Sequence, residues 1–185
     1  RVASNPKVVR VIVDFAGGSQ ALRAVVGGSA DVVSGAFEHT VNMQSKGQRL
    51  RAFALQGRAP QIVLAVNRKT MPGFKTVADL TAAAKARPGA MNFASAGIGS
   101  VSHLSAERFR LSAGIDAQHI PFRGPNEAFT EVMAGRIDFY FLPLAPALPL
   151  VKEGQLVALA VSTDTRAAAL PDVPTTTELG LEDSA

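Results

Sequence analysis

Short apolar runs alternate with amphipathic helical stripes along most of this 185-residue chain. Strands are expected over residues 8–13, 31–34, 50–55, 61–66, 90–94, 117–122, 137–142 and 156–161. Helices are expected around residues 21–26, 37–46, 77–86, 100–111 and 128–133, and a further helix begins in the proline-rich stretch 143–149. Strands that alternate with helices of this length are typical of a mainly parallel sheet in an α/β fold.

Four loops of small or polar residues follow predicted strands. They span residues 15–19, 34–36, 95–100 and 122–124. In open α/β sheets, ligands bind outside the carboxyl ends of the strands, where these loops are expected. Four such loops at one edge predict a ligand-binding cleft there.

The loop at residues 95–100, Ser-Ala-Gly-Ile-Gly-Ser, carries the clearest chemical signal. Gly97 and Gly99 allow a sharp turn and a close approach of a ligand to the backbone. The first-turn N–H groups of the helix that begins at Ser100 have no partner within the helix, and the helix dipole adds partial positive charge. The loop therefore predicts a cradle for a small anion such as a carboxylate, sulfonate or phosphate.

Two other glycine motifs are excluded at this loop. A dinucleotide-binding fingerprint needs a third glycine three residues after Gly99, where the chain has Ser102. A phosphate-binding Walker loop needs a lysine, and no lysine lies nearby. A plain strand-to-helix turn that binds no ligand remains the alternative.

Composition excludes several classes of protein. A hydrophobic content of 47% with 18% charged residues indicates a packed globular chain. The net charge is only +4 and the basic residues are scattered, which argues against a nucleic-acid surface. The chain has no cysteine for disulfides or thiolate metal sites, and no apolar stretch approaches the roughly 20 residues of a membrane span. The N-terminus carries no signal peptide, so an exported protein would be represented here in mature or shortened form.

The second part of the chain contains the stretches Val77-Ala-Asp-Leu80, Asn92-Phe-Ala-Ser-Ala-Gly-Ile-Gly-Ser100 with His103-Leu104, and His119-Ile-Pro-Phe-Arg-Gly124. Through them, residues 71–183 resemble the substrate-binding proteins of tripartite tricarboxylate transporters, the Bug-type periplasmic receptors. Residues 8–67 instead resemble the nitrate, sulfonate and thiamine-precursor type of ABC-importer binding protein. That likeness rests on Val13-Asp-Phe-Ala-Gly-Gly-Ser-Gln20 and Gly28-Ser-Ala-Asp-Val-Val-Ser-Gly35.

Both families share the two-lobed type II periplasmic binding fold, so the resemblance implies that fold here. It implies a shortened first lobe over residues 1–70, a second lobe over residues 71–165 and a return segment over residues 166–185. The turn at residues 67–75 is predicted to be the hinge between the lobes.

The resemblance also implies the residues that bind the ligand. In the second lobe these are Ser95, Ala96, Gly97, Gly99, Ser100 and His103, with backbone N–H groups of Gly99 and Ser100 and hydroxyls of Ser95 and Ser100 facing a carboxylate. In the first lobe they are Gly17, Gly18, Ser19, Gln20, Ser34, Gly35 and Ala36. Arg123 follows a predicted strand and is expected to add a charge partner at the same edge.

We therefore expect a monomeric periplasmic solute-binding protein that closes two lobes on a small organic anion and passes it to the subunits of a membrane transporter. We expect a carboxylate ligand and no cofactor, metal, nucleic-acid partner or enzymatic activity. The alternatives are an ABC-importer receptor for a sulfonate, nitrate or thiamine precursor, an effector-sensing regulatory domain, and a hydrolase that uses Ser100 and His103. The hydrolase is disfavoured because these two residues share one helical turn and no Gly-x-Ser-x-Gly elbow is present, which favours a structural His103.

Overall fold

The computed structural model describes residues 18–33, 43–50 and 61–181. The predicted strand at 8–13, nearly all of the strand at 50–55 and most of the helix at 37–46 lie outside these residues. Helix α1 (Gly18–Val26) begins at the predicted glycine turn. The strand predicted at 31–34 is wrong for residues 31–33, which form no strand. Val32 is 63% exposed, so this segment is not packed against other residues, whereas apolar strand residues are normally at least half buried.

The five strands form one sheet in the order β3-β2-β4-β1-β5. They are β1 (Ile62–Asn67), β2 (Met91–Ser95), β3 (Ala117–Pro121), β4 (Phe139–Pro143) and β5 (Leu156–Val161). The pairs β3–β2 and β2–β4 are parallel, whereas β1 is antiparallel to both β4 and β5. Four strands therefore share one direction, and the predicted mainly parallel sheet is confirmed with β1 as the exception.

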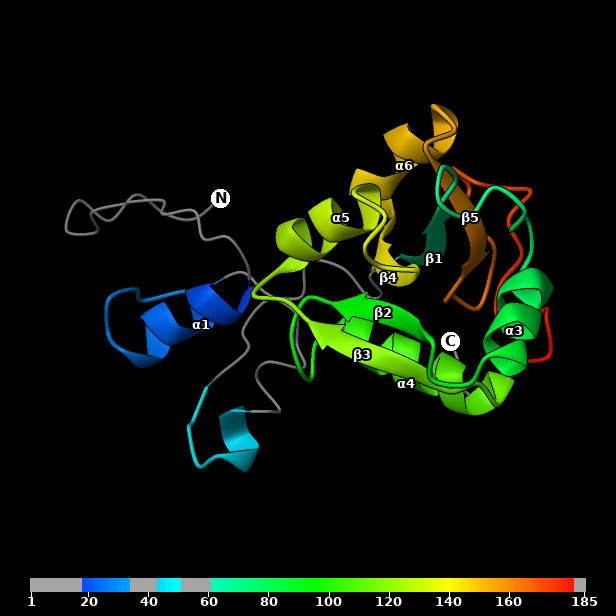
Figure 1. Cartoon of the computed structure of the whole chain (residues 1–185). Coiled ribbons are helices and arrows are strands. Elements are labelled where there is room, and N and C mark those ends of the chain that lie inside the picture. The colour runs from blue at the N-terminus through cyan, green and yellow to red at the C-terminus, as the bar shows by residue number, and fades with distance from the viewer. Residues whose placement is uncertain (1–17, 34–42, 51–60, 182–185) are drawn as a thin grey trace.

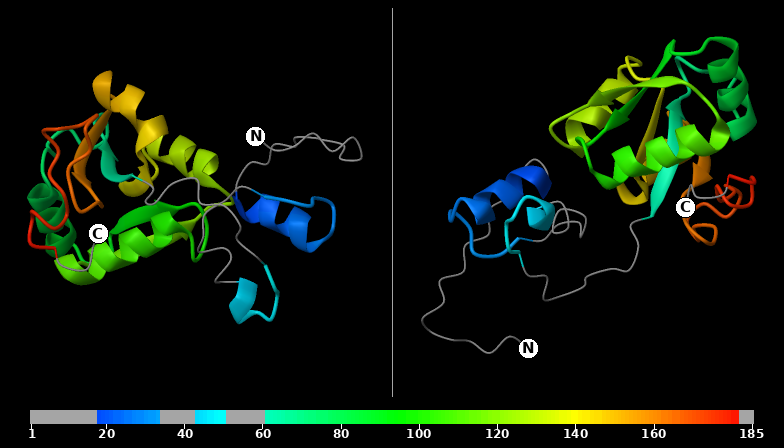
Figure 2. Two further views of the ribbon diagram at one scale, coloured as in Figure 1. Left: turned by 180° about the vertical axis from the view of Figure 1, so that it is seen from behind. Right: turned by 90° about the horizontal axis from the view of Figure 1, so that it is seen from below.

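Four helices cover the two faces of this sheet. They are α3 (Val77–Ala86), α4 (Val101–Ala113), α5 (Pro125–Met133) and α6 (Leu144–Lys152). Helices α3 and α4 pack on one face, and α5 and α6 pack on the other (Figures 1 and 2). None of the helices in the described part of the chain is both long and apolar enough to cross a membrane.

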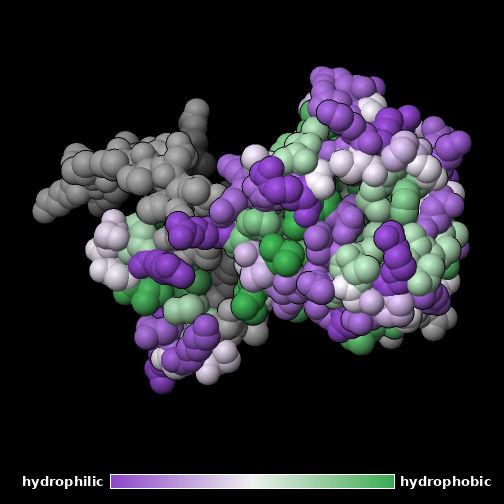
Figure 3. Space-filling model, viewed as in Figure 1, coloured by the Kyte–Doolittle hydropathy of each residue, from purple (hydrophilic) through white to green (hydrophobic). Residues whose placement is uncertain are grey.

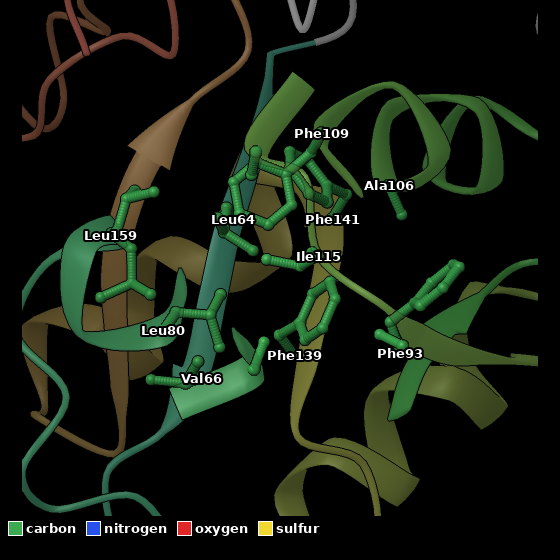
Figure 4. Close-up of a cluster of buried hydrophobic side chains, with 14 of the residues drawn as sticks. Leu64, Val66, Leu80, Phe93, Ala106, Phe109, Ile115, Phe139, Phe141 and Leu159 are labelled. Carbon is green, nitrogen blue, oxygen red and sulfur yellow. The ribbon is translucent and has the colours of Figure 1, made fainter. Parts of the chain in front are cut away.

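Strand β1 is the centre of the hydrophobic core. All six of its residues are buried, which explains why the sequence shows a continuous apolar run there. Leu64 and Val66 face the layer of α3 and α4, where they meet a cluster of phenylalanines that includes Phe139 (Figure 4). Val63 and Ala65 face the layer of α5 and α6. The strand thus joins both halves of the core.

The direction of β1 decides where the chain enters the sheet. Ile62 pairs with Pro143 and Asn67 pairs with Leu156, so β1 starts at the carboxyl edge of the other strands and ends at their amino edge. The segment at 67–75 therefore lies at the amino edge, away from the loops that follow β2 and β3. The predicted hinge at 67–75 thus lies on the side of the sheet away from those loops, and the sheet already includes β1, which precedes the boundary that we expected at residue 70.

Helix α3 begins and ends where the sequence predicts. The Thr76 hydroxyl accepts a hydrogen bond from the N–H of Asp79 (3.2 Å), and the Asp79 carboxylate accepts one from the N–H of Thr76 (2.8 Å). The N–H of Lys75 also donates to this carboxylate, and these bonds lower the pKa of Asp79. This capping box satisfies first-turn donors that the helix itself cannot.

We predict that Thr76→Ala lowers the free energy of unfolding by about 1 kcal/mol, because it removes the cap acceptor of α3. Urea unfolding followed by circular dichroism measures the change. Thr130→Ala is the matched control, since the Thr130 hydroxyl only donates back to the carbonyl of Asn126 on an exposed helix face. Equal losses in the two variants would contradict the capping role.

Candidate anion-binding site

Two of the four predicted loops lie side by side at the carboxyl edge of the sheet. Strands β2 and β3 are parallel neighbours, and Ser95 pairs with Pro121 at their ends. The N–H of Phe122 donates to the carbonyl of Ser95 (3.0 Å), which joins the loop at 96–100 to the loop at 122–124. Figures 1 and 2 show α1 beyond these strand ends.

The loop after β2 needs its two glycines. Gly97 has φ = 121° and Gly99 has φ = 77°, both in the region that side chains other than glycine rarely adopt. Ser100 then caps α4 by accepting a hydrogen bond from the N–H of His103 (3.4 Å). The predicted tight turn and helix start are confirmed.

Two buried serine hydroxyls hold the shape of this loop. The Ser102 hydroxyl accepts from the N–H of Ala96 (2.9 Å), and the Ser95 hydroxyl accepts from the N–H of Gly97 (3.1 Å). Ser95 is 0% exposed and Ser102 is 5% exposed. Their polar groups therefore bind the chain itself and fix the loop against the end of the sheet.

The backbone donors that we predicted for the ligand are also used inside the loop. The N–H of Gly99 donates to Nδ1 of His103 (3.2 Å), and the N–H of Ser100 donates to the carbonyl of Gly97 (3.1 Å). The Ser100 hydroxyl donates to the same carbonyl (2.6 Å). In this structure the donors of Gly99 and Ser100 are therefore turned to the protein, which differs from the predicted arrangement.

Other first-turn donors stay without a partner. Among the described residues, no hydrogen bond is formed by the N–H groups of Val101 and Ser102 in α4 or of Asn126 and Glu127 in α5. Helix α5 starts at Gly124 without a side-chain cap. Both helices begin at the same edge of the sheet, so the positive ends of two helix dipoles lie together there.

Two histidines stack directly beneath the loop. The rings of His103 and His119 have centroids 4.1 Å apart and planes inclined by 27°. Nε2 of His119 lies 2.7 Å from the hydroxyl oxygen of Ser95. Burial lowers the pKa of His119, the charge of His103 lowers it further, and Glu107 opposes both effects.

These contacts bear on the roles of the two histidines. His103 forms a hydrogen bond near the helix terminus with Gly99, as a structural histidine would. The stacking of His119 on His103 has no signal in the sequence, because the two rings come from α4 and β3 and no local spacing reveals their contact. Within the described ranges, no three His, Cys, Asp or Glu residues gather closely enough to hold a metal ion.

A hollow of about 390 Å³ opens beside the loop. It is lined by Arg23, Ala96, Gly97, Ile98, Pro121, Phe122 and Arg123. Arg23 from α1 and Arg123 from the loop after β3 thus line the hollow together with apolar residues. Ile98 is 77% exposed, and the space-filling view shows apolar surface on the side turned toward α1 (Figure 3).

The structure places the predicted site residues unevenly around this hollow. Ala96, Gly97 and Arg123 line it, and the remaining predicted residues of the second lobe shape the loop behind. Arg23 was missed, because a lone arginine on a short helix carries no sequence signal for a ligand. Of the predicted first-lobe residues, Gly18, Ser19 and Gln20 form the first turn of α1, and Gly17, Ser34, Gly35 and Ala36 lie outside the described residues.

A second hollow, of about 330 Å³, lies at the opposite edge of the sheet. Its lining residues are Asn67, Arg68, Lys69, Met133, Gly154 and Gln155. The Asn67 amide donates to the carbonyls of Val132 and Met133, at the carboxyl end of α5 (both 2.9 Å). Helix ends of this kind carry partial negative charge, so this hollow suits an anion less well than the first does.

Tyr140 belongs to the core and not to the hollow. It is 1% exposed, and the apolar run that surrounds it forms β4, as predicted. Burial raises the pKa of Tyr140 to about 12, and the neighbouring Ser102 hydroxyl offsets part of this effect. No hydrogen bond of normal geometry satisfies the Tyr140 hydroxyl.

The sequence matches the family model of the tripartite tricarboxylate transporter family receptor over residues 54–185. The match covers more than half of the chain, and the chain belongs to this family, which is a family of receptors and not of enzymes. A UPF0065 protein of Bordetella pertussis is 31% identical over 143 residues, which are 77% of this chain and 43% of that relative.

Two solved structures resemble the chain in fold. Rpa4515 of R. palustris, solved with adipate, has a TM-score of 0.62 and 29% identity over 66% of this chain and 40% of its own. The periplasmic aliphatic sulphonate binding protein SsuA of Escherichia coli has a TM-score of 0.59 and 25% identity over 82% of this chain and 47% of its own. The type II periplasmic binding fold is thus confirmed, and the chain spans less than half the length of these relatives.

We predict that Ser102→Ala lowers the free energy of unfolding by about 1–3 kcal/mol, because the N–H of Ala96 loses its acceptor next to a buried site. Ser105→Ala on the same helix is the control, since no hydrogen bond of the Ser105 hydroxyl is found in the described part of the chain. Urea unfolding of both variants gives the two values. A loss in Ser102→Ala no larger than in the control would show that this hydroxyl does not hold the loop.

Proposed function

We propose that this chain is part of a periplasmic receptor that captures a small organic anion, a carboxylate in the first place, between two lobes and delivers it to a membrane transporter. The observation that carries the proposal is the hollow at the carboxyl edge, where two helix amino ends and two arginines lie together. The receptor acts as a monomer, and its action is binding and release without a chemical step.

Electrostatics favour an anion at this edge. The first turns of α4 and α5 leave backbone donors without partners, and Arg23 and Arg123 line the hollow. A guanidinium matches the two oxygens of a carboxylate in a bidentate geometry. Because two arginines approach the hollow from different elements, a ligand with two anionic groups is held best.

The apolar wall adds a second criterion for the ligand. Ile98 and Phe122 line the same hollow as the arginines, and Ile98 is mostly exposed. An exposed isoleucine at a loop tip gains stability when an apolar group covers it. A carboxylate with a hydrocarbon body satisfies both the wall and the arginines, and the adipate in the similar Rpa4515 structure supports this choice.

The remaining second-lobe residues act by shaping the loop. Ser95 and His103 accept the N–H groups of Gly97 and Gly99, and Ser100 caps the helix that supplies the free donors. We further propose that Gly17 to Gln20 and Ser34 to Ala36 supply the ligand contacts of the first lobe, where α1 carries Arg23 at the edge of the hollow.

Closure of the lobes takes place at the carboxyl edge. The chain enters the sheet at Ile62 there, and β5 ends at Val161 at the same edge. The N–H of Ser162 donates to the carbonyl of Ile62 (3.0 Å), so a hydrogen bond joins the two places where we propose that the chain passes between the lobes. A ligand that bridges the lobes shifts the population toward the closed state.

A sulfonate receptor for an ABC importer is the second candidate. SsuA resembles a larger share of this chain than Rpa4515 does, 82% against 66%. A sulfonate is also an anion that helix amino ends and arginines bind. Direct comparison of adipate, malate and an alkanesulfonate by calorimetry and thermal shift separates the two candidates, because a ligand at 100 times its dissociation constant adds about 2.7 kcal/mol of stability.

We predict that Arg123→Gln weakens binding of the preferred anion by about tenfold or more, because a charge-assisted hydrogen bond to the ligand is lost. Arg87→Gln is the matched control, since Arg87 is an exposed arginine that follows α3 at the opposite edge of the sheet. Isothermal titration calorimetry measures both. Equal affinities in Arg123→Gln and the parent chain would place the anion elsewhere, and binding of none of the anions would overturn the proposed function.

A further inference from the structure

The two stacked histidines are hydrogen-bonded to the loop at residues 95–100, which we call the cradle, so a change in their protonation can change this loop. His103 accepts the N–H of Gly99 through Nδ1 (3.2 Å). His119 contacts the Ser95 hydroxyl (2.7 Å), which accepts the N–H of Gly97 (3.1 Å). Each glycine of the loop is thus held by one imidazole, either directly or through one hydroxyl.

The bond between Gly99 and His103 requires an unprotonated ring nitrogen. An N–H group donates only to a lone pair, so Nδ1 of His103 carries no proton in this structure. When a proton from solvent binds Nδ1, a second N–H replaces that lone pair and the bond is lost. Histidine is the side chain that makes this change between about pH 5 and about pH 8.

We propose that His103 is a proton-operated latch on the cradle: protonation of its Nδ1 releases the N–H of Gly99 and places a positive charge behind the loop, so that proton uptake and anion binding strengthen each other. The coupling rests on the proposed function, whereas the latch itself is a property of the loop. The released N–H and the imidazolium both become donors for an anion at the edge where α4 begins.

Charged groups from several elements lie around the two stacked histidines. His119 from β3 faces His103 across the stack, and Glu107 lies one turn further along α4, paired with Arg110 (2.9 Å). Arg123 and Arg23 line the hollow in front of the loop. Repulsion between the stacked rings lowers the pKa of His119 beyond the effect of burial, which opposes a second proton on the pair.

Linkage fixes the sign of the effect. An anion that binds the protonated form better draws a proton onto the protein, and by reciprocity the proton raises the affinity for the anion. Anion affinity therefore rises when His103 takes up a proton. For a coupling free energy of the usual size between proton and anion, the anion affinity changes by about tenfold.

The latch is tested without any ligand by a pH titration of the ¹⁵N-labelled chain. The amide resonance of Gly99 is expected to move with the imidazole resonances of His103 as the pH falls from about 8 to about 5. The amide of Gly114 is the internal control, because it donates to backbone carbonyls at the end of α4. In His103→Asn, whose amide oxygen replaces Nδ1 as acceptor and does not titrate, the Gly99 resonance is expected to stay constant.

A Gly99 amide that moves no more than Gly114, or that moves equally in His103→Asn, overturns the latch. Calorimetry then tests the coupling, with adipate and with sulfate as ligands; sulfate is the stricter probe because its charge is constant over this range. We expect binding to be about tenfold tighter near pH 6 than near pH 8. In His103→Asn we expect no such trend. A flat affinity in the parent chain overturns the coupling. If no anion binds while Gly99 still titrates, the proposed function falls and the latch stands.

Discussion

The insertion of β1 between β4 and β5 is the constraint on which the other parts depend. This strand supplies the centre of the sheet, and all of its residues are buried. Its alternate residues join the helical layer of α3 and α4 to the layer of α5 and α6. Because β1 runs against its neighbours, it brings the preceding chain to the carboxyl edge of the other four strands. The position of a cleft and the direction from which the chain reaches it follow from this one pairing.

The same topology gives the two edges of the sheet opposite electrostatic character. At the carboxyl edge, α4 and α5 begin, and Arg23 and Arg123 line a hollow there. At the amino edge, α5 and α6 end, and their partial negative charge is offset by Arg68 and Lys69. Helix dipoles and side chains therefore carry the same sign of charge at the first edge, whereas at the second edge the two effects oppose each other.

Local patterns in the sequence predicted the elements well. The capping box at Thr76 and the glycine at 114 place the ends of α3 and α4, and β5 spans the predicted residues. These signals lie within one turn or one strand, so a single sequence carries them. The glycine pattern also predicted the tight turn at residues 95–100, which the structure shows with two positive-φ glycines before a helix. The family resemblance added the two-lobed fold.

Contacts between distant segments could not be predicted in this way. The antiparallel setting of β1 depends on partners 75 to 98 residues further along the chain, from Ala65 with Tyr140 to Val63 with Val161, so local patterns do not reveal it. The stacking of His103 on His119 joins a helix to a neighbouring strand, so spacing along the chain does not reveal it. The bond from the Gly99 N–H to His103 spans only four residues, but the glycine pattern alone does not show that this donor is used within the loop.

The most direct test of the account is a ¹H–¹⁵N titration of the chain with adipate, read residue by residue. We expect the largest amide shifts at residues 97–102 and 123–127, where the helix amino ends and Arg123 meet the hollow. Shifts confined to Asn67, Arg68, Lys69 and the turn at Gly154 would place the ligand at the opposite edge and contradict the central claim.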